Sequence, residues 1–315
     1  MVGTMVWVIW QMMADAAGPG LLFLLSPLVL VPLLLANFSD EEPSPVWRAL
    51  IWSQLPCALA LVLGLSLKPS AFALLACVPW AGWTALLAFE GLTRLLARYR
   101  NHGLPGLASG ELAVIAGLVF PLVGSVWLLA DRLGVELLGF DALFVRLTAV
   151  HFHHAGLSLP LMAGLLARER PEGVVRYAAL TIVLAVPLVA LGITFSPLLE
   201  VVGSLMTASA ASVVGLGLLA RSRELEVIPA LLSALAGAAL LGAMCFAASY
   251  AIGEYRAVPW PDIISMIQLH GAVNALGFGL LGAWSWYLVP VRGPAQVESE
   301  DEAEASESIE GSSAK

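Results

Sequence analysis

Long apolar segments constrain the fold of this chain more than any other feature of its sequence. A helix needs roughly 20 apolar residues to cross the hydrocarbon core of a bilayer. Inside lipid the backbone must satisfy its own hydrogen bonds, so such segments are expected to be helical. We predict an all-α, polytopic transmembrane helical bundle of about nine spans. The predicted spans are 20–37, 49–67, 70–90, 111–132, 141–167, 174–197, 199–221, 226–251 and 262–288.

The composition agrees with an integral membrane protein. Of the 315 residues, 59% are hydrophobic and 12% are charged, whereas about 25% of the residues in soluble domains are charged. The net charge of -8 arises largely in residues 293–315, because residues 1–292 contain 16 acidic and 14 basic residues. The body of the protein is therefore nearly neutral. Neither this balance nor any motif indicates a nucleic-acid partner.

Three regions follow from this pattern. Residues 1–19 form an apolar N-terminal segment that we expect to lie along the membrane interface or to join the first span. Residues 20–292 form the transmembrane helical domain, and none of its loops is long enough for a soluble domain. Residues 293–315 are acidic and poor in apolar residues, so we predict a disordered C-terminal tail.

The loop charges predict the orientation in the membrane. If the C-terminus lies inside, ten arginines fall in inner loops, and the outer loops hold three basic residues, Lys68, Arg132 and Arg256. This asymmetry follows the positive-inside rule. We therefore expect a multi-pass protein of the cell's inner (plasma) membrane with a cytoplasmic C-terminus and membrane lipid as its partner.

The fifth predicted span carries an unusual basic cluster within "RLTAVHFHHAGLSLP" (146–160). Ionisable residues inside a membrane are costly and often functional. At 100° per residue, His151 and His154 share one helix face, while Arg146 and His153 align on another. His270 and Asn274 lie at a comparable predicted depth in the ninth span. We therefore predict a histidine-lined pocket between the fifth and ninth spans.

These residues predict particular chemical roles. His151, His153 and His270 would act as general acids or bases, or alternatively as metal ligands. Arg146 would bind an anionic group of the substrate, with Asp141 or Glu200 as its carboxylate partner. A further hypothesis gives substrate binding to Asn274 and His154.

Several functions fit that set of residues. The leading hypothesis is a membrane enzyme that acts on a lipophilic small molecule. The alternatives are a transporter or proton-coupled carrier, a haem- or metal-binding membrane protein, and a purely structural protein whose histidines join helices. The cofactor is left unknown, because the sequence contains no HExxH, GxxxxGK[ST] or GxSxG motif.

Two segments carry a resemblance to a known family. They are "HFHHAGLSLPLMAGLLARERP" (151–171) and "LHGAVNALGFGLLGAWSW" (269–286). At these segments the chain resembles the YndJ-like family of bacterial multi-pass membrane proteins. Its pattern of HFH, an aromatic residue and AG is broken at His154, which favours His151 and His153 as shared residues. The resemblance implies a membrane location and two marked segments, and it implies no reaction.

Overall fold

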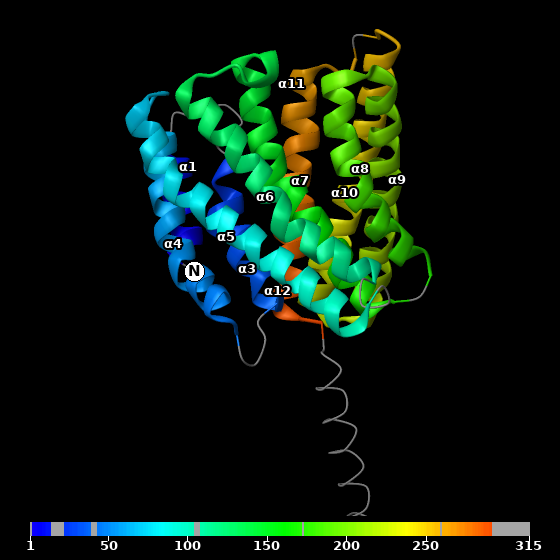
Figure 1. Ribbon diagram of the computed structural model, residues 1–315. Coiled ribbons are helices and arrows are strands. Elements are labelled where there is room, and N and C mark those ends of the chain that lie inside the picture. Colours follow the sequence, from blue (N-terminus) through cyan, green and yellow to red (C-terminus); the bar gives the residue numbers. More distant parts are fainter. Residues whose placement is uncertain are drawn as a thin grey trace, which may run out of the picture.

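The computed structural model describes residues 2–13, 22–38, 43–103, 108–171, 173–258 and 260–291. Within these ranges every regular element is a helix (Figure 1). The acidic tail predicted at 293–315 lies outside the described residues, as does part of the N-terminal segment. The all-helical prediction is therefore confirmed for the part of the chain that the structure describes.

Long helices that alternate in direction make up the bundle. The chain begins with α1 (Val2–Met13) and an interrupted helix over residues 22–38, which contains the π-helical segment η1 (Ser26–Leu30), α3 (Val31–Leu35) and η2 (Ala36–Phe38). The long helices are α4 (Pro45–Ser66), α5 (Ala71–His102), α6 (Ser109–Leu133), α7 (Ala142–Glu169), α8 (Val174–Phe195), α9 (Pro197–Arg221) and α10 (Val227–Tyr255). The last helix is built from α11 (Ile263–Ser265), η6 (Met266–Gly271), η7 (Val273–Leu281) and α12 (Gly282–Leu288), and the short 3-10 turns are η4 (Leu137–Gly139) and η5 (Ser222–Glu224).

Side-chain caps explain where several of these helices begin. The first amides of a helix have no partner within the helix, and a Ser or Asp oxygen placed before them accepts one of these hydrogen bonds. Asp141 accepts from Phe144 N at 2.9 Å at the start of α7. The same arrangement occurs at Ser44, Ser70, Ser196 and Asp262, which cap α4, α5, α9 and α11.

Seven helices are long and apolar enough to cross a membrane, so the predicted count of nine is not confirmed. The two predicted spans without such a counterpart are 20–37 and 141–167. The first is replaced by the short apolar helix Ser26–Phe38. The second forms α7, which has 28 residues but contains Arg146 and three histidines. Length and hydropathy alone did not separate a short buried helix from a span.

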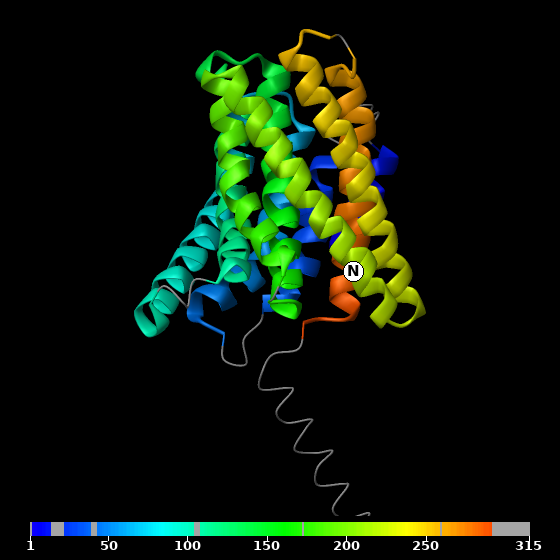
Figure 2. The ribbon, with the colours of Figure 1, turned by 90° about the vertical axis from the view of Figure 1, so that its right-hand side faces the viewer.

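The interior of the bundle is formed by the 22–38 segment and α7. Residues 23–31 are all buried, and so are nearly all residues of α7 from Phe152 to Ala167. In both views the blue 22–38 segment lies among the other helices (Figures 1 and 2). Because protein rather than lipid surrounds these two elements, polar side chains on them can find hydrogen-bond partners.

Small residues bring neighbouring helices close together. A Cβ added at Gly237 on α10 would lie 2.5 Å from the carbonyl oxygen of Gly215 on α9. In a membrane, helix association depends on such close packing, because lipid gives no hydrophobic drive between helices. The small residues of α9 and α10 thus let these two helices pack closely.

The two ends of the bundle differ in charge. The α5, α7 and α9 helices finish at one end of the bundle, from which residues 289–291 leave the last helix (Figure 2). Arginines gather at this end, here called the basic end. The α5 helix, with 32 residues, is about 48 Å long, so its arginine-bearing last turns extend past a hydrocarbon core of about 30 Å. The opposite end holds Lys68, Arg132 and Arg256.

Candidate functional site

A cleft of about 240 Å³ lies toward the opposite end of the bundle, between α1, α4, α6 and α7. One part of its wall is apolar and the other carries an ion cluster. The lining residues are Trp10, Phe23, Leu65, Leu67, Pro69, Leu128, Asp131, Arg132, Arg146, Ala149 and Val150.

The ion cluster consists of Asp131, Arg132 and Arg146. The Nε atom of Arg132 donates to Asp131 Oδ2 at 2.9 Å, and its Nη1 atom donates to the Leu67 carbonyl at 3.2 Å. The Nε atom of Arg146 donates to Asp131 Oδ1 at 3.1 Å. The Asp131 and Arg132 side chains are almost fully buried, whereas the Arg146 side chain is 41% exposed. Two cations thus share one carboxylate beside an apolar surface.

The hairpin between α6 and α7 brings this cluster together. Asp131 and Arg132 occupy the last turn of α6, which ends at Gly134 in the left-handed conformation (φ 70°). Arg146 lies near the start of the antiparallel α7. The predicted partners of Arg146 were wrong, because Asp141 caps α7 and Glu200 lies in the first turn of α9. The sequence signal that was missed is that Asp131 and Arg146 lie on opposite sides of the short connection between α6 and α7.

His153 lies buried in the interior below the cleft. The indole Nε1 of Trp80 donates to its Nε2 at 2.9 Å, and its Nδ1 donates to the Ala149 carbonyl at 2.8 Å. The ring of Phe23 meets the imidazole edge-on, with the ring centroids 4.7 Å apart. Both imidazole nitrogens are therefore engaged within the protein, and His153 joins α5, α7 and the 22–38 segment.

The other histidines lie on a different face of α7 or across from it. His154 Nε2 donates to the Leu22 carbonyl at 2.8 Å. His151 is exposed on the bundle surface. His270 Nδ1 lies 3.0 Å from the Ala243 carbonyl, and Asn274 Nδ2 lies 3.2 Å from His270 Nε2. The predicted separation of two α7 faces thus agrees with these contacts.

The cleft is not the histidine-lined pocket predicted from the sequence, and that pocket stays a prediction. The cleft is lined by none of the five histidines, and His153 points away from His151 and His270 toward Trp80. Among the described residues, no group of three His, Cys, Asp or Glu side chains is placed to hold a metal ion. The metal-ligand hypothesis for His151, His153 and His270 therefore has no ligand set in this arrangement.

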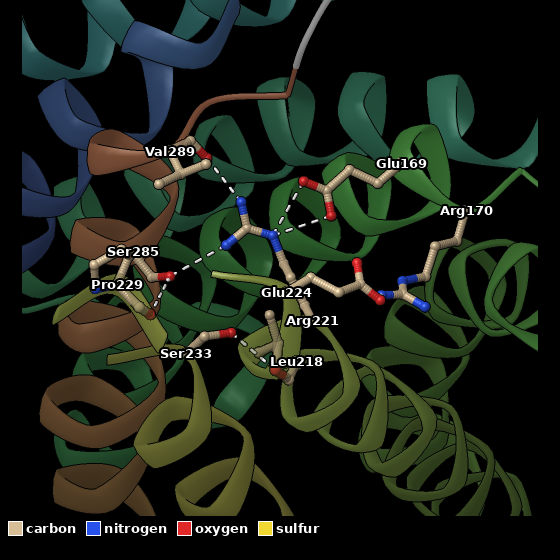
Figure 3. Close-up of polar contacts among 9 residues, drawn as sticks. All are labelled: Glu169, Arg170, Leu218, Arg221, Glu224, Pro229, Ser233, Ser285 and Val289. Carbon is tan, nitrogen blue, oxygen red and sulfur yellow. Dashed lines mark hydrogen bonds and ion pairs between the residues drawn. The ribbon is translucent and has the colours of Figure 1, made fainter. Parts of the chain in front are cut away.

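A second buried polar cluster ties the basic end together (Figure 3). Arg221 is 1% exposed, and its guanidinium carbon lies 3.8 Å from the ring centroid of Trp286. The three donating nitrogens reach Glu169 Oε2 at 3.0 Å, Ser285 Oγ at 3.2 Å and the Val289 carbonyl at 2.7 Å. The arginine thus links α9 to α7 and to the last helix, and its contacts match a structural role.

The fold and its buried polar clusters define an integral membrane protein with several candidate helical spans. A family model described as "YndJ-like protein" matches residues 21–278, and the chain belongs to this YndJ-like family. A relative from Bacillus subtilis (strain 168), "Uncharacterized membrane protein YndJ", is 30% identical over 224 residues.

That match covers 68% of this chain and 40% of the relative, so the chain spans less than half the length of the relative that it matches. No solved structure matches the chain. The resemblance noted at 151–171 and 269–286 is thereby confirmed at the level of the family.

Proposed function

We propose that this membrane protein binds a lipophilic molecule with one anionic group in the cleft beside Asp131, Arg132 and Arg146. The observation that carries the proposal is the placement of two guanidinium groups and one carboxylate against an apolar wall. In this proposal Arg146 binds the anionic group, which is the role that the sequence predicts for it.

Charge favours an anionic ligand at this position. The three side chains together leave one net positive charge, and the partly exposed Arg146 side chain presents it to a ligand that enters the cleft. Arg146 uses only its Nε atom in the cluster. Its two terminal nitrogens make no hydrogen bond to any residue that the structure describes. Such a guanidinium can donate two parallel hydrogen bonds to a carboxylate or phosphate.

The walls favour a lipophilic ligand body. Phe23, Leu128 and Val150 provide apolar surface, and Trp10 adds a buried indole N–H without a partner among the described residues. The volume of about 240 Å³ is below the roughly 300–1,000 Å³ of typical ligand pockets. The cleft therefore suits an acidic head and the first part of an apolar chain, with the rest of the chain in the surrounding lipid.

The geometry supports a carrier of such a molecule better than an enzyme. The cleft borders the 22–38 helix, which contains the π-helical η1, and π-helical turns occur frequently at functional sites. The enzyme hypothesis requires His151, His153 and His270 to act on one substrate. Because both His153 nitrogens are engaged in the interior, that catalytic set stays a prediction.

The proposal extends to orientation. We propose that the basic end faces the cytoplasm of the plasma membrane, because the positive-inside rule assigns arginine-rich ends to that side. The cleft then faces outward.

We also propose that α7, with 28 residues, crosses the membrane although it is more polar than the seven candidate spans. In a cysteine-free background, a single cysteine would replace either Arg176, at the basic end, or Glu136, at the opposite end. An impermeant maleimide added to whole cells should react only with the cysteine at position 136.

Ligand binding tests the proposed function. Protein in lipid nanodiscs is titrated with a dansyl-labelled fatty acid and with the uncharged amide of the same chain. We expect the acid to bind more tightly than the amide. The Arg146→Gln variant should weaken acid binding roughly 10- to 100-fold, because charge-assisted hydrogen bonds contribute about 1.5–3 kcal/mol.

The matched control is Arg176→Gln, which removes an exposed arginine packed over Tyr177 on α8. This variant should bind the acid as the unmodified protein does. Equal binding of acid and amide, or equal loss in both variants, would reject the cleft as a site for an anionic ligand.

A further inference from the structure

A second group of polar side chains runs along the α7 face that carries His151, His154 and Ser158. These residues are spaced by three and four positions, so they follow one another along the same face. His154 reaches the carbonyl of Leu22 beside η1. On the other side, a Cβ placed at Gly279 of η7 would lie 3.9 Å from Ser158 Oγ. The lower part of this stripe therefore lies between two π-helical segments.

Two buried atoms of this stripe have no partner among the described residues. They are Nδ1 of His154 and Oγ of Ser158. A carbonyl oxygen only accepts, so the contact with Leu22 places the proton of neutral His154 on Nε2 and leaves Nδ1 as an acceptor. The hydroxyl of Ser158 is a donor as well as an acceptor. One turn of helix therefore presents a free acceptor and a free donor to the same interior region.

Such atoms require a partner. Buried polar atoms in folded proteins almost always bond to the protein or to ordered water. Most of the other intramembrane serines of this chain bond to a carbonyl, as Ser212 does with Ala208 O at 2.8 Å and Ser233 with Leu218 O at 2.9 Å. Ser158 forms no such bond, and among the described residues it is the one serine whose buried hydroxyl has no partner.

The neighbouring backbone leaves a third polar group at this place. The Cβ position of Gly279 lies 3.2 Å from the carbonyl oxygen of Asn274, five residues earlier in the same π-helical segment, and 3.3 Å from Leu30 Cδ1 of η1. A carbonyl that already accepts one hydrogen bond has a second lone pair. Buried water usually makes about three hydrogen bonds, and His154, Ser158 and Asn274 together offer that number.

We propose that His154 Nδ1, Ser158 Oγ and the Asn274 carbonyl form a buried water-binding niche between α7, η1 and η7. Toward the basic end it is closed, because Met162 Sδ lies only 2.7 Å from the Cβ position of Gly282.

The niche is separate from the cleft of the proposed function. The niche is formed by His154, Ser158 and Asn274, whereas His153 bonds to Trp80 and Arg146 bonds to Asp131 on the other face of α7. No ligand in the cleft is required for water to occupy the niche. The two proposals can therefore fail independently.

Solid-state NMR of the full chain in lipid bilayers tests the niche. With ¹⁵N-labelled histidine, magnetisation transfer from water to each imidazole nitrogen is measured, and His154→Gln identifies the His154 signals. We expect transfer to His154 Nδ1 in the unmodified protein and its loss in Ser158→Ala. Ser158→Thr keeps the hydroxyl and should keep the transfer.

Ser212→Ala is the matched control, since it removes a helical serine on α9 that bonds to its own helix. It should leave the His154 signals unchanged. The unfolding temperature of each variant verifies that the fold is retained. Absence of transfer to Nδ1 in the unmodified protein, or equal transfer in Ser158→Ala and Ser158→Thr, would overturn the proposal.

Discussion

The indole of Trp80 donates a hydrogen bond to Nε2 of His153 at 2.9 Å and thereby joins α5 to α7 in the interior of the bundle. Trp80 is also stacked on Trp83, with ring centroids 4.8 Å apart. Ser125 Oγ on α6 lies 3.5 Å from the same imidazole nitrogen. Three long helices therefore meet at one fully buried histidine, which explains why a histidine is tolerated there.

Replacing Trp80 by Phe should destabilise the protein. The variant leaves the His153 acceptor without its indole donor, and an unsatisfied buried polar atom costs about 1–3 kcal/mol. We expect a lower unfolding temperature in detergent. Intrinsic fluorescence or calorimetry measures this temperature. Trp52→Phe on α4 is the control, because Trp52 is 83% exposed. An unchanged unfolding temperature in Trp80→Phe would show that this hydrogen bond does not hold α5 to α7.

Arg221 should be among the least replaceable residues of the chain. Its removal would leave the Glu169 carboxylate without its cation, and breaking a buried ion pair from one side costs about 3–5 kcal/mol. Arg221→Lys should also destabilise the fold, because an ammonium cannot reach Glu169, Ser285 and the Val289 carbonyl from one planar group. Yield and unfolding temperature of the purified variants give the measurement. Arg223→Ala, at an exposed neighbouring position, should behave as the unmodified protein.

Asp131→Asn should have opposite effects on stability and on binding. The change removes the carboxylate shared by Arg132 and Arg146, so the two cations lose their counter-charge and the unfolding temperature should fall. The cleft gains positive charge, and the dansyl-labelled fatty acid should bind more tightly. Glu136→Gln, an exposed acid near the same end of the bundle, should change neither quantity. Weaker acid binding in Asp131→Asn would contradict the charge argument for the cleft.

Two glycine substitutions should change the free energy of unfolding in opposite directions. A Cβ at Gly124 would lie 2.6 Å from His153 Nδ1 and 2.9 Å from Phe152 Cβ, so Gly124→Ala should displace His153 and cost about 1–3 kcal/mol. A Cβ at Gly82 on α5 would meet nothing within 4 Å. Gly82→Ala should therefore stabilise that helix by up to about 1 kcal/mol. Chemical unfolding of both variants side by side checks the difference.

Much of the helical layout could be predicted from hydropathy, and the failures have physical causes. The spans over α4, α8, α9 and α10 were placed near their observed bounds, because each exposes apolar surface over about 20 residues. The segment 20–37 is equally apolar, but it is apolar because it is buried in protein. Hydropathy does not distinguish these two environments, so the predicted count of nine spans stays a prediction.

The candidate site was predictable only in part. The 100° rotation per residue separated the face of His151 and His154 from that of Arg146 and His153, and the contacts agree with that separation. The partner of Arg146 was not predictable in the same way, since it depends on how α6 and α7 pair across their hairpin. The buried state of Arg221 was missed because an arginine near a helix end is usually a solvated loop residue.

The burial of residues 22–38 has a consequence for biogenesis. This segment is covered by α1, α4, α7 and parts of the last helix, and all of these except α1 leave the ribosome after it. Most of its final neighbours are therefore not present when it first meets the insertion machinery. The centre of the molecule can therefore be completed only when the last helix has been delivered, so its assembly is a late event that follows membrane insertion of the surrounding helices.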